Sequence, residues 1–462
     1  MDITLEIERF DRRGFGAAPA EVRAGKRTLA VPYTIPGETV RAGLTERRVK
    51  GHLIAEVHDV IRAHPARIPA RCPHFGTCGG CTWQHIAPEA QTAMKTERVK
   101  AFLRDHGLDD GVVRPAIGMA EPWHYRNKME FTFTPEGALG LHALLHFDRT
   151  VPLSVCYIAH PALFAVAEAT AAWARAHRLS GYDKRRHEGL LRHLMVRYSE
   201  AERTVLAALF ATVPPDASTD LTRAAKAWTE MLAALDAERG VRVAGAFWIV
   251  YGGRADKAGY DAVHHLFGAP HIVDELDGVR YRIAPQTFFQ TNRLQAERLL
   301  ETALQYAEPE PDMHALDLFS GVGTFTLPLA RRVRKAVGVE VVPEAVEAAY
   351  ANARENGADN VDFVAGDVRR GMERALERLE SRVDLVLLDP PRSGAGGKVM
   401  RKLGRLGAPR IVYVSCNPET FASDVRELFA FGYRLAEVQP VDMFPQTAHV
   451  ELVARLEQGP RS

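Results

Sequence analysis

The chain has little cysteine, no long apolar run and almost no net charge, and each absence removes a class of protein. Five of its 462 residues are cysteine, too few for a disulfide-stapled secreted scaffold. No run of about 18 apolar residues suggests a membrane span, and residues 1–8 do not resemble a signal peptide. A formal net charge of +1 means that any nucleic-acid surface must be local. We expect a cytoplasmic protein with reduced thiols and no membrane partner.

Short strands separated by turns dominate the start of the chain. Residues 29–31, 38–44 and 53–60 are apolar or alternate with polar residues, between turns rich in glycine and proline. This spacing is typical of a small β-barrel, which we place at residues 1–68. Residues 1–71 hold 13 Lys or Arg against 9 Asp or Glu. Such a mildly basic barrel suits either an RNA-binding module or an ordinary solvated face.

Three cysteines follow the barrel in the spacing C-x5-C-x2-C: Cys72, Cys78 and Cys81. Cys156 is the next cysteine along the chain. Four soft thiolates suit a zinc ion or an iron–sulfur cluster. Five residues between cysteines exceed the spacing that zinc prefers, although His74 or His85 could complete a zinc site. The pattern predicts a metal centre and leaves the metal open.

Residues 69–283 predict a central α+β region. Helical patterns cover residues 88–106, 161–178 and 221–238, with strand-like segments between them. Residues 125–133 interleave basic and aromatic side chains. Such a strand could contact phosphates and stack on bases, or it could be an edge strand with its charges outward.

From about residue 313 strands and helices alternate, which predicts a doubly wound α/β domain over residues 284–462. A strand runs into the glycine-containing loop 320–324, where backbone can approach a ligand closely. The third glycine of the dinucleotide fingerprint is missing, which favours a ligand without pyrophosphate, such as S-adenosylmethionine. Acids follow three later strands, at Glu340, Asp367 and Asp389. Parallel strands end at one edge of a sheet, so we expect these acids to line one crevice.

Cys416 follows the apolar run 411–414, which predicts a buried parallel strand. A lone cysteine is usually a small core residue. At the carboxyl end of a central strand, however, a thiol would face the same crevice as the acids. The acids around the predicted crevice favour this second interpretation.

Motifs along essentially the whole chain resemble the bacterial 5-methyluridine RNA methyltransferases, most closely those acting on 23S ribosomal RNA. The motifs are the G-x-G, V-P and I-P-G-E pattern of a TRAM domain within residues 14–38, the four cysteines, and residues 284–292, 317–324, 389–392, 415–418 and 443–451. The resemblance implies a Rossmann-like class I methyltransferase domain, an OB-like TRAM barrel and a central domain carrying a [4Fe–4S] cluster. It also implies that Cys416 is the nucleophile and Glu451 the base.

The resemblance assigns ligands as well. Those of the cluster would be Cys72, Cys78, Cys81 and Cys156. Those of S-adenosylmethionine would be Gln290, Phe319, Thr324, Glu340, Asp367 and Asp389. Transfer-RNA members of the family commonly lack both the TRAM domain and the cluster, which points to ribosomal RNA. Ser320 stands where many relatives have cysteine.

The implied chemistry explains why a thiol and a carboxylate are needed. Uracil C5 is a poor nucleophile until a thiolate adds at C6, and cysteine is both a good nucleophile and a good leaving group. A carboxylate must then remove the C5 proton, and Glu451 is the predicted base. Asp389 could contact the cofactor or the uracil. The target base must leave any stack to reach Cys416.

Several alternatives stay open. The same chemistry could act on transfer RNA. A cytosine-C5 methyltransferase usually carries a second cysteine where this chain has Asp389-Pro390-Pro391-Arg392, and amino-methylating enzymes have an aromatic residue in place of Arg392. A non-enzymatic alternative is an iron–sulfur RNA-binding redox sensor. We expect a monomer.

Overall fold

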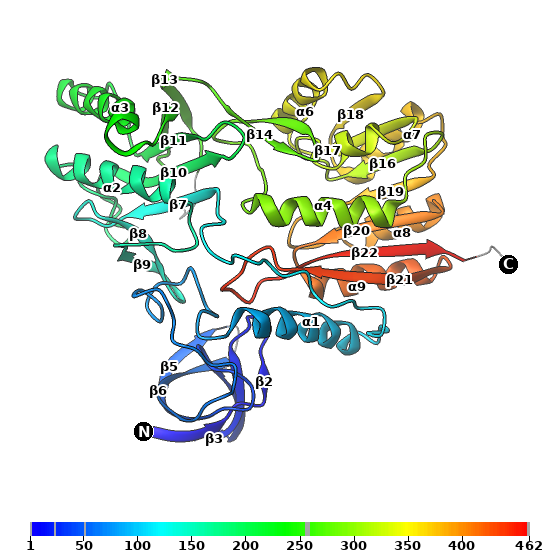
Figure 1. The fold of residues 1–462 in the computed structure, drawn as a ribbon, viewed down its shortest axis with the longest axis horizontal. Coiled ribbons are helices and arrows are strands. Elements are labelled where there is room, and N and C mark those ends of the chain that lie inside the picture. The colour runs from blue at the N-terminus through cyan, green and yellow to red at the C-terminus, as the bar shows by residue number, and fades with distance from the viewer. Residues whose placement is uncertain (1, 23–24, 50–51, 255–258, 460–462) are drawn as a thin grey trace.

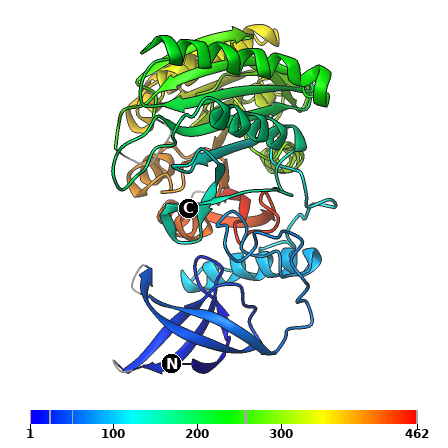
Figure 2. The same cartoon turned by 90° about the vertical axis from the view of Figure 1, so that its left-hand side faces the viewer.

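The computed structural model describes residues 2–22, 25–49, 52–254 and 259–459, which form four β-sheets (Figure 1). The N-terminal strands lie at the bottom of Figure 1, the central sheet at upper left and the C-terminal sheet at right. A second view shows the N-terminal strands as a small curled body, with a long helix between it and the rest of the molecule (Figure 2).

The N-terminal sheet has six strands: β1 (Asp2–Glu6), β2 (Arg9–Phe10), β3 (Gly16–Val22), β4 (Gly25–Val31), β5 (Thr39–Val49) and β6 (His52–Arg62). Their order is β1-β5-β6-β4-β3-β2. Its core buries Leu5, Leu29 and Val40, each from a different strand. Side chains alternate between the two faces of a strand, so one apolar face suffices for a small core. The predicted small barrel is confirmed.

The central sheet has seven strands: β7 (Lys128–Phe133), β8 (Leu139–Ala143), β9 (His146–Pro152), β10 (Leu191–Ser199), β11 (Thr204–Ala211), β12 (Val243–Val250) and β13 (Ala262–Gly268). The helices α2 (Pro161–Ala176) and α3 (Thr219–Arg239) pack against it and bury Trp173 and Trp228. The α3 helix begins where Ser218 accepts a hydrogen bond from the Leu221 N–H and ends at Gly240 with φ 65°.

The basic and aromatic segment 125–133 differs from both of its predicted roles. β7 lies between β10 and β8 and is therefore an interior strand. Phe131 and Phe133 are 1% exposed and lie in the core beside α2. Their rings are not free to stack on bases. The pattern misled because a strand covered on one face also alternates polar and apolar residues.

The C-terminal sheet has seven strands: β16 (His314–Leu318), β17 (Lys335–Glu340), β18 (Val361–Ala365), β19 (Leu385–Leu388), β20 (Arg410–Ser415), β21 (Tyr433–Val441) and β22 (Glu451–Gln458). Their order is β18-β17-β16-β19-β20-β22-β21. The first five neighbours pair in parallel, and β22 is antiparallel to both β20 and β21. The predicted doubly wound α/β domain is confirmed.

Helices cover both faces of this sheet: α4 (Arg293–Ala307), α5 (Thr326–Ala330), α6 (Pro343–Glu355), α7 (Val368–Arg378), α8 (Gly397–Leu406) and α9 (Pro418–Phe429). One face packs against α4 and α6, the other against α7, α8 and α9. Ahead of α4, β14 (Ile272–Leu276) and β15 (Val279–Ile283) form a hairpin through Asp277 and Gly278, both at positive φ, as a tight hairpin turn requires.

The helix α1 (Pro88–Asp105) joins the N-terminal half of the chain to the C-terminal sheet. It packs against α9 and β21, and its Val99 and Leu103 are fully buried in the core on that side of the sheet. Lys95 is wholly buried and forms an ion pair with Asp442. Its ammonium also donates to the Phe444 carbonyl at 3.1 Å. Among the described residues, no helix is long and apolar enough to cross a membrane.

Replacing Lys95 by methionine tests this junction. Lys95→Met leaves the buried Asp442 carboxylate without its cation, so we expect a loss of about 3–5 kcal/mol of stability. Urea denaturation followed by intrinsic fluorescence measures it. The double variant Lys95→Met/Asp442→Leu removes both charges and should recover much of the loss. A single variant as stable as the parent chain would contradict a buried, mutually dependent pair.

Candidate active site and cysteine pocket

The loop after β16 turns sharply at the carboxyl edge of the C-terminal sheet. Phe319 has φ 64°, a conformation that is unusual for a bulky residue. The N–H groups of Phe319 and Ser320 donate to the Val339 carbonyl at 2.9 and 3.1 Å. Gly323 has φ 88°, and a Cβ there would lie 3.2 Å from Leu327. The glycine-containing loop is therefore a tight turn fixed to the neighbouring strand.

Glu340 ends β17 and holds this loop in place. One carboxylate oxygen accepts the Gly321 N–H at 3.0 Å, and the other accepts the Val342 N–H at 2.9 Å. The side chain is 9% exposed. A residue predicted to bind S-adenosylmethionine thus stands beside the glycine loop, and each of its oxygens has a further lone pair for a ligand donor.

Asp317, in the middle of β16, is a buried acid that was not among the predicted site residues. Thr326 donates to one of its oxygens at 2.6 Å, and the other oxygen has no partner. Burial, and then the nearby Asp389 and Glu340 carboxylates, raise the pKa of Asp317 to about 8. An aspartate within an apolar strand was the sequence signal that could have singled it out.

Asp389 and Asp367 follow two strands of the same sheet, β19 and β18, at its carboxyl edge. Asp389 directly follows β19, and burial raises its pKa to about 7. Asp367 follows β18, caps α7 by accepting the Arg369 N–H at 3.1 Å, and is exposed. The order β18-β17-β16-β19-β20 places Asp367, Glu340, the glycine loop and Asp389 along one edge. In α/β folds this edge of the sheet is where ligands bind.

Gln290 and Thr324 reach the C-terminal sheet from different segments. Gln290 is buried just before α4, and its backbone carbonyl accepts a hydrogen bond from the Asn127 amide at 3.1 Å. Thr324 closes the glycine loop, and its carbonyl accepts the Tyr281 hydroxyl at 3.2 Å. Gln290 thus lies where the central region contacts the C-terminal domain.

Cys416 and Glu451 are brought together by strand pairing. Cys416 directly follows β20, and Glu451 is the first residue of β22. The antiparallel register pairs Ser415 with Leu452, so the next position in the same register sets Cys416 opposite Glu451. Cys416 lies in the bend after β20, just beyond the last paired residue, and Glu451 is close enough that its charge raises the pKa of the Cys416 thiol. Residues 35 positions apart in the sequence are therefore neighbours at the sheet edge.

The charges around this pair oppose ionisation. Cys416 is half-buried, and burial, followed by Glu451 and Asp389, raises the pKa of its thiol to about 11. Burial and then Asp389 raise the pKa of Glu451 to about 8. Arg392 is a nearby cation, and its charge lowers the pKa of the Cys416 thiol. A thiol and two carboxyl groups thus share one poorly solvated corner.

Arg392 is held against the turn that follows Cys416. Its carbonyl accepts a hydrogen bond from the Asn417 amide at 3.0 Å. Its guanidinium lies 3.5 Å from Nδ1 of His449, two residues before Glu451. The Asp-Pro-Pro-Arg loop, the turn after Cys416 and the segment before Glu451 therefore meet. The His449 contact joins segments 57 residues apart, so no local sequence pattern predicts it.

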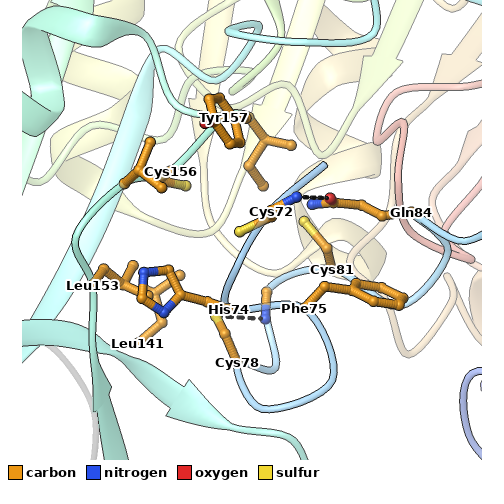
Figure 3. Close-up of a pocket in the computed structure, with 13 residues that line it drawn as sticks. Cys72, His74, Phe75, Cys78, Cys81, Gln84, Leu141, Leu153, Cys156 and Tyr157 are labelled. Atoms are coloured by element: carbon orange, nitrogen blue, oxygen red, sulfur yellow. Dashed lines mark hydrogen bonds between the residues drawn. The ribbon is translucent and has the colours of Figure 1, made fainter. Parts of the chain in front are cut away.

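All four predicted cluster cysteines line one pocket in the central region (Figure 3). Cys72, Cys78 and Cys81 come from one loop, and Cys156 faces them from the segment after β9. Apolar side chains complete the wall: Phe75, Leu141, Leu153, Val155 and Ile158. Burial raises the pKa of the Cys78 thiol to about 11 and of the Cys81 thiol to about 12. Thiolates in this pocket would need a cationic occupant.

The pocket does not present a ready site for one ion. Within the described residues, no three His, Cys, Asp or Glu side chains stand close enough to hold a single metal ion. His74 lines the pocket but is bonded to Ser154 at 3.0 Å. His85 is buried but does not line this pocket. The geometry brings the four cysteines together around one pocket.

Comparison with known families agrees with this architecture. A model described as tRNA (uracil-5-)-methyltransferase matches residues 269–458. A second model, described as the TRAM domain of tRNA (uracil(54)-C(5))-methyltransferase, matches residues 3–66. The first match covers the C-terminal sheet, the acids at its edge, Cys416 and Glu451. The second covers the N-terminal barrel.

Individual relatives extend the likeness to the whole chain. An uncharacterized RNA methyltransferase of Caldanaerobacter subterraneus is 34% identical over 99% of both chains. One of Gloeobacter violaceus is 36% identical over 94% of this chain and 92% of its own. The crystal structure of Pyrococcus abyssi tRNA (uracil-54, C5)-methyltransferase in complex with S-adenosyl-L-homocysteine is 28% identical, covers 98% of this chain and 99% of its own, and gives a TM-score of 0.76. The chain belongs to the RNA uracil-5-methyltransferase family.

Proposed function

We propose that this protein methylates C5 of a uridine in RNA through a covalent bond between Cys416 and uracil C6, with Glu451 as the base. The observation that carries the proposal is the cross-strand placement of Cys416 and Glu451 at the edge where the acids also gather. A cytosine-C5 enzyme is less well supported, since the family is a uracil-5 family and residues 389–392, where such enzymes usually carry a second cysteine, contain none.

The chemistry assigns one task to each side chain. The Cys416 thiolate adds to C6, which makes C5 nucleophilic. S-adenosylmethionine, when bound, supplies the electrophilic methyl group. Glu451 then takes the C5 proton, the C5–C6 double bond re-forms, and the S–C6 bond breaks to return the thiolate. Both side chains touch the same base, so both must stand at one point of the crevice.

The crevice fits S-adenosylmethionine in the chemistry of its donors and acceptors. Glu340 offers two carboxylate oxygens beside the glycine loop, as ribose hydroxyls require. Asp367 at the end of β18 would take the adenine edge, and Asp389 would face the methionine end or the uracil. We assign Gln290, Phe319 and Thr324 to the same ligand. The Pyrococcus abyssi structure carries S-adenosyl-L-homocysteine in a chain of the same fold.

We further propose that Cys72, Cys78, Cys81 and Cys156 hold a [4Fe–4S] cluster. What supports this is a single pocket that all four line, with apolar walls that would shield a cluster from water. Ligands of a cluster surround a group of ions, so they need not converge as the ligands of one zinc ion must. We infer a structural role for it, in a central domain spanning residues 69–283 between a barrel at 1–68 and a catalytic domain at 284–462, in a monomer.

The RNA substrate that we propose is 23S ribosomal RNA, with transfer RNA as the second candidate. The four cysteines favour ribosomal RNA, because transfer-RNA members of the family commonly lack the cluster. The TRAM domain does not discriminate, because the matching domain model is described from a transfer-RNA enzyme. The full-length likeness to a transfer-RNA uracil-54 enzyme favours the second candidate.

Trapping the covalent bond tests the catalytic proposal. With RNA containing 5-fluorouridine, the parent enzyme should form an adduct that survives denaturing electrophoresis, because fluorine cannot leave as a proton. Cys416→Ala should form none and should lose all measurable turnover while still binding S-adenosylmethionine. An adduct of equal yield in Cys416→Ala would contradict the assignment.

Replacing Glu451 by glutamine should slow the second half of the same reaction, the removal of the C5 proton. With ordinary RNA, we expect methylated adduct to accumulate and its release to slow by about 10²–10⁴-fold. Only the ionised carboxylate accepts a proton, so release by the parent enzyme should speed up as the pH rises through about 8. Release from Glu451→Gln should not follow that profile.

Substrate choice is tested with transcripts of the two RNAs. Purified enzyme with labelled methyl donor should modify uridine in 23S ribosomal RNA and leave a transfer-RNA pool unlabelled. Digestion and mass spectrometry of the product locate the methyluridine. Label in transfer RNA alone would overturn the ribosomal proposal and leave the covalent mechanism standing.

Metal analysis of protein purified without oxygen tests the cluster. We expect about four iron and four sulfide per chain, and Cys156→Ser should lower both. Cys416→Ser is the matched control, because it removes the one cysteine outside the pocket and should leave iron content unchanged. Zinc without iron in the parent protein would contradict the proposal.

A further inference from the structure

Residues 442–450, the segment between β21 and β22, contact the barrel, the central region and the start of α4. The segment leads directly into Glu451. Gly14 of the barrel packs against Ala448 so closely that a Cβ at residue 14 would lie 2.0 Å from the alanine Cβ. The Asn292 amide, two residues after Gln290, donates to the Met443 carbonyl at 3.0 Å, and Tyr125 of the central region donates to the Pro445 carbonyl at 2.9 Å.

Gln446, at the tip of this segment, holds an unfavourable backbone conformation. Its φ is 68°, in the left-handed region that bulky L-residues avoid. Its side chain is 1% exposed. Such a conformation persists only where the surroundings impose it, and it often marks a functional constraint.

The partners that impose it come from the cysteine-rich segment and α1. The N–H groups of Thr82 and Trp83, directly after Cys81, donate to the Gln446 carbonyl at 3.0 and 2.9 Å. The Gln446 N–H donates to the side-chain carbonyl of Gln91 at 2.9 Å, and the Gln91 amide returns a hydrogen bond to the Gln446 side-chain oxygen at 3.0 Å.

Gln91 also fixes its own side of the junction. It is 1% exposed, and its amide donates to the carbonyls of Trp83 and Ile86 at 3.1 and 2.8 Å. One side chain therefore joins α1, the turn after the cysteines and the backbone of Gln446. The backbone N–H, the backbone carbonyl and the side-chain oxygen of Gln446 are thus all hydrogen-bonded, while its side-chain nitrogen is buried without a partner.

We propose that Gln91 is a positioning residue for the proton-abstraction step. Resting on the proposed role of Glu451, the inference is that Gln91 and the segment after the cysteines hold Gln446 in its left-handed conformation and so set the position of the Glu451 carboxylate five residues later. Methyl transfer needs Cys416 and the cofactor crevice, which lie on other strands. Loss of Gln91 should therefore impair removal of the C5 proton more than methyl transfer.

The test measures the two halves of the reaction separately. In a single turnover, S-adenosylhomocysteine formation reports methyl transfer, and the fraction of RNA bound to denatured protein reports the methylated adduct that has not yet lost its C5 proton. For Gln91→Leu we expect methyl transfer within a fewfold of the parent and adduct release slower by roughly 10–100-fold, since small misplacements of a catalytic group cost this much.

Thr92→Val is the matched control on the same helix. The Thr92 hydroxyl donates only to the Pro88 carbonyl of its own helix, at 3.1 Å, so this variant should release product at the parent rate. If Gln91→Leu does not fold, Gln91→Glu replaces it. Glutamate keeps the acceptor for the Gln446 N–H but loses the amide donor, and it should also accumulate adduct.

Two outcomes separate this inference from the proposed function. If Glu451→Gln accumulates adduct and folded Gln91 variants slow both half-reactions equally, or neither, Gln91 is structural and the inference is overturned. If Glu451→Gln itself accumulates no adduct, the assignment of the base fails, whatever the Gln91 variants do.

Discussion

The thiol that the proposed mechanism requires to ionise lies among carboxyl groups whose pKa values are raised by burial. Asp317, Asp389 and Glu451 all have raised pKa values, chiefly because they are buried at one edge of a sheet, and the Asp389 carboxylate further raises the pKa of the other two. Burial, followed by the Glu451 and Asp389 carboxylates, likewise raises the pKa of the Cys416 thiol. Arg392 offsets part of this rise, and a cationic methyl donor in the crevice would offset more. Without a bound donor the thiol form is therefore favoured over the thiolate, and in the proposed mechanism the charge of the donor would itself favour the thiolate.

The fold explains how these groups come together. Parallel strands end at one edge, so four strands deliver Glu340, Asp367, Asp389 and Cys416 to the same side. The antiparallel β22 enters that edge from the opposite direction, which is why its first residue, and not its last, meets Cys416. The base can then approach the uracil from a segment that owes its position to other parts of the chain.

That segment connects catalysis to the RNA-binding half of the molecule. Residues 442–450 contact the barrel, the turn after the cysteines, α1, and Asn292 at the start of α4. The position of the cysteine loop therefore also affects Gln446, because the residues directly after Cys81 hydrogen-bond to the Gln446 carbonyl. The proposed cluster, far from the proposed catalytic residues in sequence, would then have a physical reason to matter for a reaction that transfers no electrons.

Local patterns predicted the parts of the structure that local physics decides. Apolar runs followed by an acid or a cysteine identified the strand ends, and the helices near 88–106, 161–178 and 221–238 were found within a few residues. Burial of β7 and of Lys95 escaped prediction because their covering elements are distant in the chain. Asp442, Gln446 and His449 also owe their surroundings to contacts more than 50 residues away. No window of sequence contains that information.

Tandem mass spectrometry of the trapped adduct tests the central claim most directly. After digestion of protein and RNA, the account predicts a uracil nucleotide, carrying one added methyl group, attached to the peptide at Cys416. The sulfur should be bonded to C6 of a single uridine. A nucleotide found on any other cysteine, or methyluridine formed while Cys416 carries a blocking alkyl group, would contradict it.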